Sequence, residues 1–202
     1  MGALNRRHLL GAGAAGALTL AGCGGGSGTT AATTATTGAP VPAGLPGAPD
    51  DGAVLAFMLG LEHLQADMYT RMQPAVRGTE LDLVKQLAGQ EGEHIGKLTD
   101  ELRRLRHPEP KPRTFKAVPG DRDGALAFAY RVENLVASAY LGQIGRIVDD
   151  GALSTMLSIQ TVEGRHAAAV GALRTKTATP DGAVAAGQNM ATVERVLAEL
   201  GA

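Results

Sequence analysis

The chain has 202 residues, of which 44% are hydrophobic, 3% aromatic and 19% charged. Lys and Arg number 19 against 20 Asp and Glu, which gives a net charge of −1 with His neutral, and the basic residues form no run. This mixed charge and the scarcity of aromatic side chains argue against nucleic-acid binding.

Residues 1–22 are predicted to be a signal peptide. The segment around Arg6 and Arg7, Asn-Arg-Arg-His-Leu-Leu, resembles a twin-arginine export motif, and the apolar stretch after it is too short to span a membrane. The segment Leu-Ala-Gly-Cys that ends at Cys23 resembles the lipobox of bacterial lipoproteins, in which the Cys becomes the lipidated first residue. The alternative is that Cys23 is an ordinary small residue near a cleavage site. We expect an extracytoplasmic protein, anchored to the bacterial cell membrane through a lipid on Cys23.

The sequence between this signal and residue 50 is predicted to be a tether. Residues 23–49 are mostly Gly, Ala, Thr and Pro and carry no charge, so they cannot bury a core. Cys23 is the only Cys, which excludes an internal disulfide and leaves the core or a bound metal to provide stability. Residues 50–202 are the length of one domain.

Hydrophobic residues at spacings of three and four predict an all-α domain. The expected helices cover about 51–76, 79–106, 122–148 and 151–174, and a weaker fifth helix covers about 182–200. Residues 107–120 contain four prolines and cannot be helical. Extended, this segment can run the length of the bundle, because fourteen residues reach about 46 Å. The third helix would then start parallel to the second, unlike in an up-down-up-down bundle.

One metal-ligand pattern occurs twice: a lone Glu, then Glu-x-x-His after 29 residues in the first copy and 30 in the second. Each interval is about the length of one long helix and a turn. Four helices with these residues form a two-metal carboxylate site inside a bundle. Glu and His three residues apart share a helix face, so both can reach one metal pair. The two copies are Glu62, Glu91 and His94, and Glu133, Glu163 and His166.

The segments LGLEHLQADMYTRM, EGEH, AYRVENLVASAYLGQIGRIVDD and TVEGRH resemble the exported ferritin-like domain family over residues 51 to about 174. The resemblance implies a ferritin-like four-helix bundle with one long crossover between helices two and three, to which the fifth helix is added. In the family's metal-binding relatives it also implies a di-iron or di-manganese centre.

The resemblance also implies a role for each side chain of the repeated pattern. Glu91 and Glu163 would bridge two Fe or two Mn ions. Glu62 and His94 would complete the shell of one ion, and Glu133 and His166 that of the other. Tyr69 and Tyr140 would donate hydrogen bonds to carboxylates of the opposite half. No catalytic residue is expected beyond the metal ligands.

Two function classes follow from this site. Carboxylate and imidazole ligands with open positions suit iron or manganese oxygen chemistry better than a closed zinc site, which favours an oxidoreductase of ferroxidase-like or peroxide-consuming type. The alternative is a non-catalytic metal-binding or structural bundle at the cell envelope, and turnover itself stays open. A bundle of protonated, metal-free carboxylates is also open, although no Lys or Arg stands three or four residues from any of the four Glu to replace an ion. A lipid and a tether favour a monomer or dimer over a closed cage.

Gly92 and Gly164 each follow a proposed Glu ligand directly, inside a predicted helix. Glycine costs about 1 kcal/mol there relative to Ala. The two glycines therefore suggest either a close approach of neighbouring helices or relaxed positions that face solvent.

Overall fold

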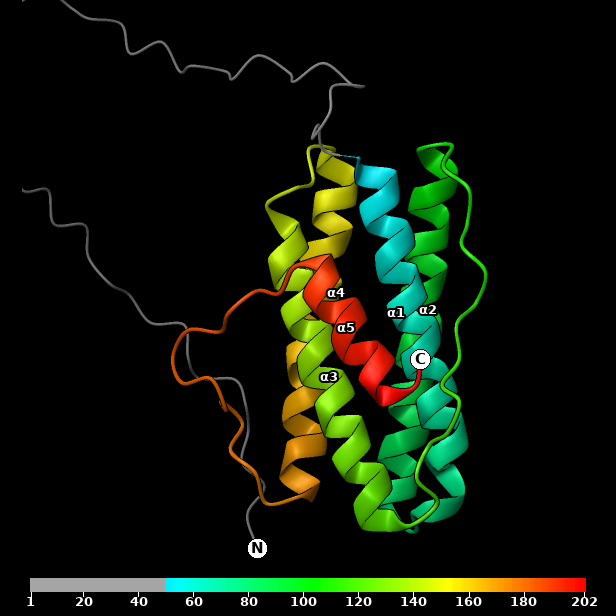
Figure 1. Cartoon of the computed structure of the whole chain (residues 1–202), viewed down its shortest axis with the longest axis vertical. Helices are drawn as coiled ribbons and strands as arrows, with labels where there is room; N and C mark the ends of the chain where they lie inside the picture. The colour runs from blue at the N-terminus through cyan, green and yellow to red at the C-terminus, as the bar shows by residue number, and fades with distance from the viewer. Residues whose placement is uncertain (1–49) are drawn as a thin grey trace, which may run out of the picture. The chain divides into compact units, whose positions relative to one another are not determined.

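The computed structural model describes residues 50–202, so Arg6, Arg7, Cys23 and the predicted tether lie outside the described residues. Within residues 50–202 the secondary structure is helical and contains no strand (Figure 1). The elements are α1 (Asp51–Met72), the 3₁₀ turn η1 (Gln73–Ala75), α2 (Thr79–Arg104), α3 (Arg122–Ile144), α4 (Asp150–Leu173) and α5 (Met190–Leu200).

Four of the five α-helices begin at a side chain that accepts a hydrogen bond from the first turn. Asp50 accepts from the N–H of Ala53, and the same bond starts the later helices at Asp121, Asp149 and Asn189. These oxygens satisfy amide groups that a helix leaves without an internal partner. The exception is α2, which follows Gly78 without a side-chain cap and instead carries Glu80 and Asp82 in its first turn, where the helix dipole favours negative charge.

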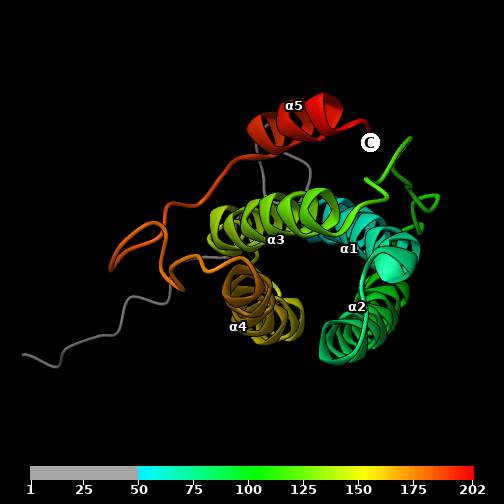
Figure 2. The same cartoon turned by 90° about the horizontal axis from the view of Figure 1, so that it is seen from below.

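The four long helices pack as two antiparallel hairpins, α1 with α2 and α3 with α4. The hairpins associate mainly through α1 and α3, and to a lesser extent through α2 and α4 (Figure 2). Because α2 and α3 run in the same direction, the predicted ferritin-like topology with one long crossover is confirmed. None of the helices in residues 50–202 is long and apolar enough to cross a bilayer.

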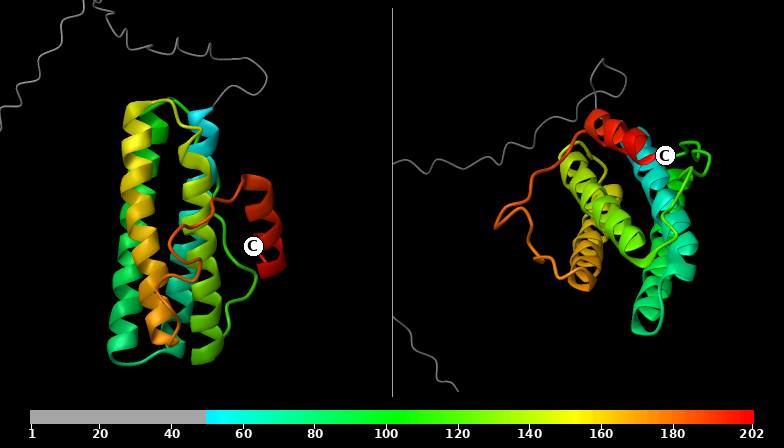
Figure 3. Two further views of the ribbon diagram at one scale, coloured as in Figure 1. Left: turned by 90° about the vertical axis from the view of Figure 1, so that its left-hand side faces the viewer. Right: turned by 60° about the horizontal axis from the view of Figure 1, so that its bottom comes forward.

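The crossover between α2 and α3 runs along the outside of the bundle, as the proline content predicts (Figures 1 and 3). Asp67 of α1 accepts a hydrogen bond from the N–H of Phe115 at 3.0 Å, and the Phe115 ring packs edge-on against Phe128 of α3. Arg113 makes a two-point ion pair with Glu194 of α5 at 2.7 and 3.0 Å. The crossover is therefore fixed to three helices.

The fifth helix lies across the outer face of α1 and α3 and is shorter than the predicted range 182–200 (Figure 2). It begins at Met190 and buries Val193 and Leu197. The residues before it are extended because they cross α3 at close range: the N–H of Gln188 donates to the carbonyl of Ser138 at 2.8 Å. A Cβ built on Gly142 would lie 2.1 Å from the carbonyl oxygen of Gln188. Only glycine fits at this crossing.

Candidate metal centre

The four long helices bring the six side chains of the repeated pattern together inside the bundle. Each Glu is completely buried, and the histidines are 8% (His94) and 2% (His166) exposed. Their ligand atoms form two overlapping groups, and within each group the atoms lie within 4.8 Å of one another. One group is Glu62, Glu91, His94 and Glu163; the other is Glu91, Glu133, Glu163 and His166. Glu91 and Glu163 belong to both groups.

In the first group, Nδ1 of His94 is surrounded by carboxylates. It lies 3.2 Å from Glu62 Oε2, 3.2 Å from Glu91 Oε2 and 3.1 Å from Glu163 Oε1. These residues come from α1, α2 and α4, so the cluster connects both hairpins.

In the second group, Nδ1 of His166 has a matching position. It lies 2.9 Å from Glu91 Oε1, 3.6 Å from Glu163 Oε1 and 3.9 Å from Glu133 Oε2. Glu91 thus turns one oxygen toward each histidine, which is the orientation of a carboxylate that can bridge two ions. The rings of the two histidines stack, with centroids 5.7 Å apart.

Two tyrosines donate hydrogen bonds to the two glutamates that belong to only one group each, Glu62 and Glu133. Tyr69 of α1 donates to Glu133 Oε1 at 2.6 Å, and Tyr140 of α3 donates to Glu62 Oε1. Each hydroxyl therefore bonds to the Glu of the opposite half. Burial, followed by the charge of the nearby glutamates, raises the pKa of both tyrosines well above the usual range, so both remain protonated donors.

Two glutamines complete the hydrogen bonding around the cluster. Gln65 Nε2 donates to Glu163 Oε2 at 2.7 Å and to Glu133 Oε1 at 3.2 Å. Gln90 Oε1 lies 2.9 Å from Nε2 of His166, the ring nitrogen that points away from the carboxylates. An acceptor at Nε2 keeps the proton there and leaves Nδ1 free to bind a metal. Gln65 stands three residues after Glu62 and so shares its helix face, whereas nothing in the helical spacing indicates Gln90.

Four carboxyl groups share this buried volume with only two imidazoles. Among residues 50–202, the only basic groups within ion-pair distance of the four carboxylates are the two histidines. Burial raises the pKa of Glu62 to about 7 and also raises the pKa of Glu133 and Glu163. Burial alone would lower the pKa of His94, but hydrogen bonds with Glu163, Glu62 and Glu91 raise it to about 12. Each shift reflects a need for positive charge in this volume.

Five buried polar atoms around this volume have no hydrogen-bond partner. Buried carboxylate oxygens and imidazole nitrogens are normally hydrogen-bonded, and a set that is not calls for an explanation such as a bound ion. The unpartnered atoms of the cluster are Glu91 Oε1, Glu133 Oε2, Glu163 Oε1, His166 Nδ1 and Gln65 Oε1. Four of these five atoms are ligand types that iron and manganese accept readily. The residues present therefore fit a metal pair.

Several residues that are close to the ligands in sequence do not take part in the cluster. The guanidinium carbon of Arg174 lies over the ring of Tyr130, 5.3 Å from its centre. Gln160 lines a surface pocket. Gly92 and Gly164 are exposed, and a Cβ on either would have no neighbour within 4 Å. The suggestion of close helix approach at these glycines is therefore wrong, and the solvent-facing alternative is correct.

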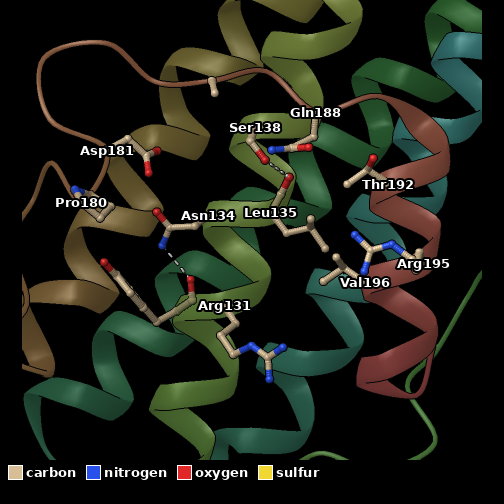
Figure 4. A pocket seen from close by; sticks show the side chains of 12 residues that line it. Arg131, Asn134, Leu135, Ser138, Pro180, Asp181, Gln188, Thr192, Arg195 and Val196 are labelled. Carbon is tan, nitrogen blue, oxygen red and sulfur yellow. Dashed lines mark hydrogen bonds between the residues drawn. The ribbon is translucent and has the colours of Figure 1, made fainter.

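One surface pocket lies apart from the cluster. It has a volume of about 530 Å³ and lies between α3, α5 and the segment that connects α4 to α5 (Figure 4). Arg131 and Arg195 stand at its edge, and Leu135 and Val196 form part of its apolar wall. None of the six clustered side chains lines it.

Comparison with known proteins agrees with this architecture. A family model described as a ferritin-like domain matches residues 50–176. Among solved structures, a conserved hypothetical protein from Mycobacterium tuberculosis superposes with a TM-score of 0.56 at 16% sequence identity, covering 68% of this chain and 96% of that chain. At this identity the likeness concerns the fold alone. No curated protein sequence matches the chain.

Proposed function

Because the chain belongs to the ferritin-like domain family, we propose that it binds two iron or two manganese ions and uses them to react with oxygen or peroxide. We further propose that it does so outside the cytoplasm, attached to the cell membrane by a lipid on Cys23. The export and anchoring parts rest on the motifs at Arg6, Arg7 and Cys23.

The observation that carries the proposal is the set of unpartnered, buried donor atoms between the two histidines. Four carboxylates in one buried volume are very costly without compensating positive charge. Two divalent cations carry the charge needed to balance them. No Lys or Arg of the described residues takes that role, since only His94 and His166 lie within ion-pair distance.

The geometry supports an assignment of ligands to two positions. One position is formed by Glu62 and His94, and the other by Glu133 and His166, with Glu91 and Glu163 shared between them. When bound, a pair of iron or manganese ions supplies the electrons or the redox cycle for reduction or disproportionation of oxygen species. The protein side chains fix the carboxylates: Tyr69 and Gln65 orient Glu133, and Tyr140 orients Glu62.

The main competing function is a metal site that only stabilises the fold at the cell envelope. The near-complete burial of the ligands favours it, because five of the six are at most 2% exposed. A structural site closes its coordination shell with protein ligands, whereas a catalytic site keeps a position for the substrate. The two functions therefore differ in reactivity and not in metal content.

The test begins with protein loaded with Fe(II) or Mn(II) without oxygen. Elemental analysis should give two ions per chain, and the loaded protein should consume oxygen or peroxide faster than free metal does. Glu91→Ala should lose both metal and activity, and Glu93→Ala, at an exposed position beside it, should keep both. Full loading without turnover would leave the structural function, and folded protein that binds no metal would refute both.

A further inference from the structure

The two halves of the bundle match at the six clustered side chains but differ immediately around them. Gln65 stands three residues after Glu62, and the residue three after Glu133 is Val136. Gln90 stands directly before Glu91, and the residue directly before Glu163 is Val162. At both positions the first half has an amide and the second half a valine.

Both amides act on the second half of the site. Gln65 donates to Glu133 and Glu163, and Gln90 accepts from His166. The second half has valines at the matching positions, and a valine side chain cannot form the equivalent hydrogen bonds to Glu62 or His94. The tyrosine hydrogen bonds, in contrast, are the same in both halves, because Tyr69 bonds to Glu133 and Tyr140 bonds to Glu62. The amides are therefore the groups that make the halves unequal.

The two histidines also differ in exposure and in hydrogen bonding. His94 is 8% exposed and His166 is 2% exposed. Among residues 50–202, Nε2 of His94 has no hydrogen-bond partner, whereas Nε2 of His166 is bonded to Gln90. His94 is therefore the more accessible of the two rings, and it is held through Nδ1 alone, whereas His166 is also held through Nε2.

Building on the proposed two-metal function, we propose that the two metal positions are inequivalent and that Gln65 and Gln90 cause the difference. The Glu133–His166 position binds its ion more tightly and releases it more slowly, because hydrogen bonds orient its ligands before the metal binds. The Glu62–His94 position is the exchangeable one, filled second and open to small molecules from solvent. Hydrogen bonds of this kind change metal affinity by about 10- to 100-fold, so the two dissociation constants should differ by at least tenfold.

The experiment is an anaerobic titration of the full chain with Mn(II), in which free Mn(II) is measured by electron paramagnetic resonance. The wild type should show a tight and a weak step. His94→Ala should keep the tight step, and His166→Ala should lose it. The double variant Gln65→Val, Gln90→Val gives both halves valine at these positions. It should reduce the ratio of the two dissociation constants by about 10- to 100-fold, toward equality, because the contribution of these hydrogen bonds is lost. Gln160→Val is the matched control, since Gln160 lines a surface hollow and makes no bond to the cluster, and it should leave both constants unchanged.

Two further variants keep the test decisive if the double variant does not fold. Gln90→Val alone, at a half-buried position, removes the bond to His166 and should bring the two dissociation constants closer together. Gln90→Glu keeps an acceptor for His166 and should preserve the ratio. Equal constants in the wild type, or loss of the tight step in His94→Ala, would overturn this inference while leaving the two-metal function intact. Absence of any Mn(II) binding to folded wild-type protein would overturn the proposed function itself.

Discussion

At the scale of single residues, Tyr69 and Tyr140 join the two halves of the chain through buried hydroxyl groups. Each hydroxyl donates a hydrogen bond to one glutamate of the opposite half and so helps to orient it. We expect Tyr69→Phe or Tyr140→Phe to lower Mn(II) affinity by about 10- to 100-fold, the usual range for the loss of a bond to a metal ligand. Isothermal titration calorimetry measures the effect directly.

The third tyrosine provides the control for this prediction. Tyr130 contacts Arg174 and lies outside the cluster, so Tyr130→Phe should leave Mn(II) affinity as in the wild type. If all three substitutions behave alike, the hydroxyl groups have no role in holding the ligands.

The repeated spacing of Glu and Glu-x-x-His is enough to predict which side chains meet inside the bundle. Gln90 could not be predicted in this way, because a residue directly before Glu91 is turned about 100° around the helix. It reaches His166 only because α4 lies beside α2. A comparison of the two halves gives a signal, because Gln90 and Val162 stand at matching positions directly before the two Glu-x-x-His motifs.

At the scale of elements, the start of α4 depends on Asp149. Its side chain caps the helix by accepting from Ala152, and it also pairs with Arg104 at the end of α2. We expect Asp149→Ala to reduce the free energy of unfolding by about 0.5–2 kcal/mol from the cap, as measured by urea denaturation. Asp149→Asn keeps a cap and removes only the ion pair, so its loss should be smaller.

The same residue gives this prediction a pH dependence. The hydrogen bond from Arg104, followed by that from the Ala152 N–H, lowers the pKa of Asp149 to about 2. A lowered pKa means that the contribution is present above the ordinary Asp value of about 4 and disappears as the pH falls toward 2. The stability difference between wild type and Asp149→Ala should therefore shrink over that interval. A difference that is constant from pH 5 to pH 2 would contradict the role of the ionised carboxylate.

The crossing of Gly142 and Gln188 predicts a second effect at this scale. Gly142→Ala places a methyl group where the carbonyl oxygen of Gln188 lies, so the segment before α5 must move. We expect α5 to detach in part and expose Val193 and Leu197, seen as faster hydrogen exchange in residues 188–200. Gly145→Ala, whose Cβ would meet nothing within 4 Å, should leave exchange unchanged. Equal exchange in both variants would show that the crossing is not tight.

The type and order of the helices follow from local spacing, but some ends depend on contacts between distant segments. The prolines of residues 107–120 predict the crossover because each acts on its own backbone. The start of α5 was missed because the sequence of residues 182–189 does not show that they cross α3. That crossing uses the hydrogen bond between Gln188 and Ser138, which are far apart in the chain.

At the scale of the whole molecule, a bound metal pair would connect both hairpins, since its ligands come from α1, α2, α3 and α4. Metal affinity then becomes folding free energy. We expect removal of metal by a chelator to lower the Tm, and a metal concentration of 100 Kd to restore about 2.7 kcal/mol. Differential scanning calorimetry at several Mn(II) concentrations tests this, and a Tm independent of metal would contradict it.

The proposed export route yields a prediction about the precursor. A twin-arginine signal transfers a protein that has already folded, so the bundle and its metal can be completed before export. Arg6→Lys with Arg7→Lys should retain the precursor inside the cell with normal metal content. Cys23→Ser should release a normal bundle from the membrane fraction. Cell fractionation with immunoblotting decides both, and unchanged membrane attachment in Cys23→Ser would refute lipid anchoring.

The crossover at residues 105–121 has a consequence for how such a site can evolve. Two identical helix hairpins that assembled as a homodimer would supply the same set of Glu and His ligands. In a homodimer, however, one mutation changes both sides at once, so one side could not have Gln65 while the other has valine at the matching position. Joining the hairpins in one gene lets each side accept mutations independently. The crossover keeps two hairpins of different sequence together in one molecule, so a centre with unequal sides forms in every copy of the chain.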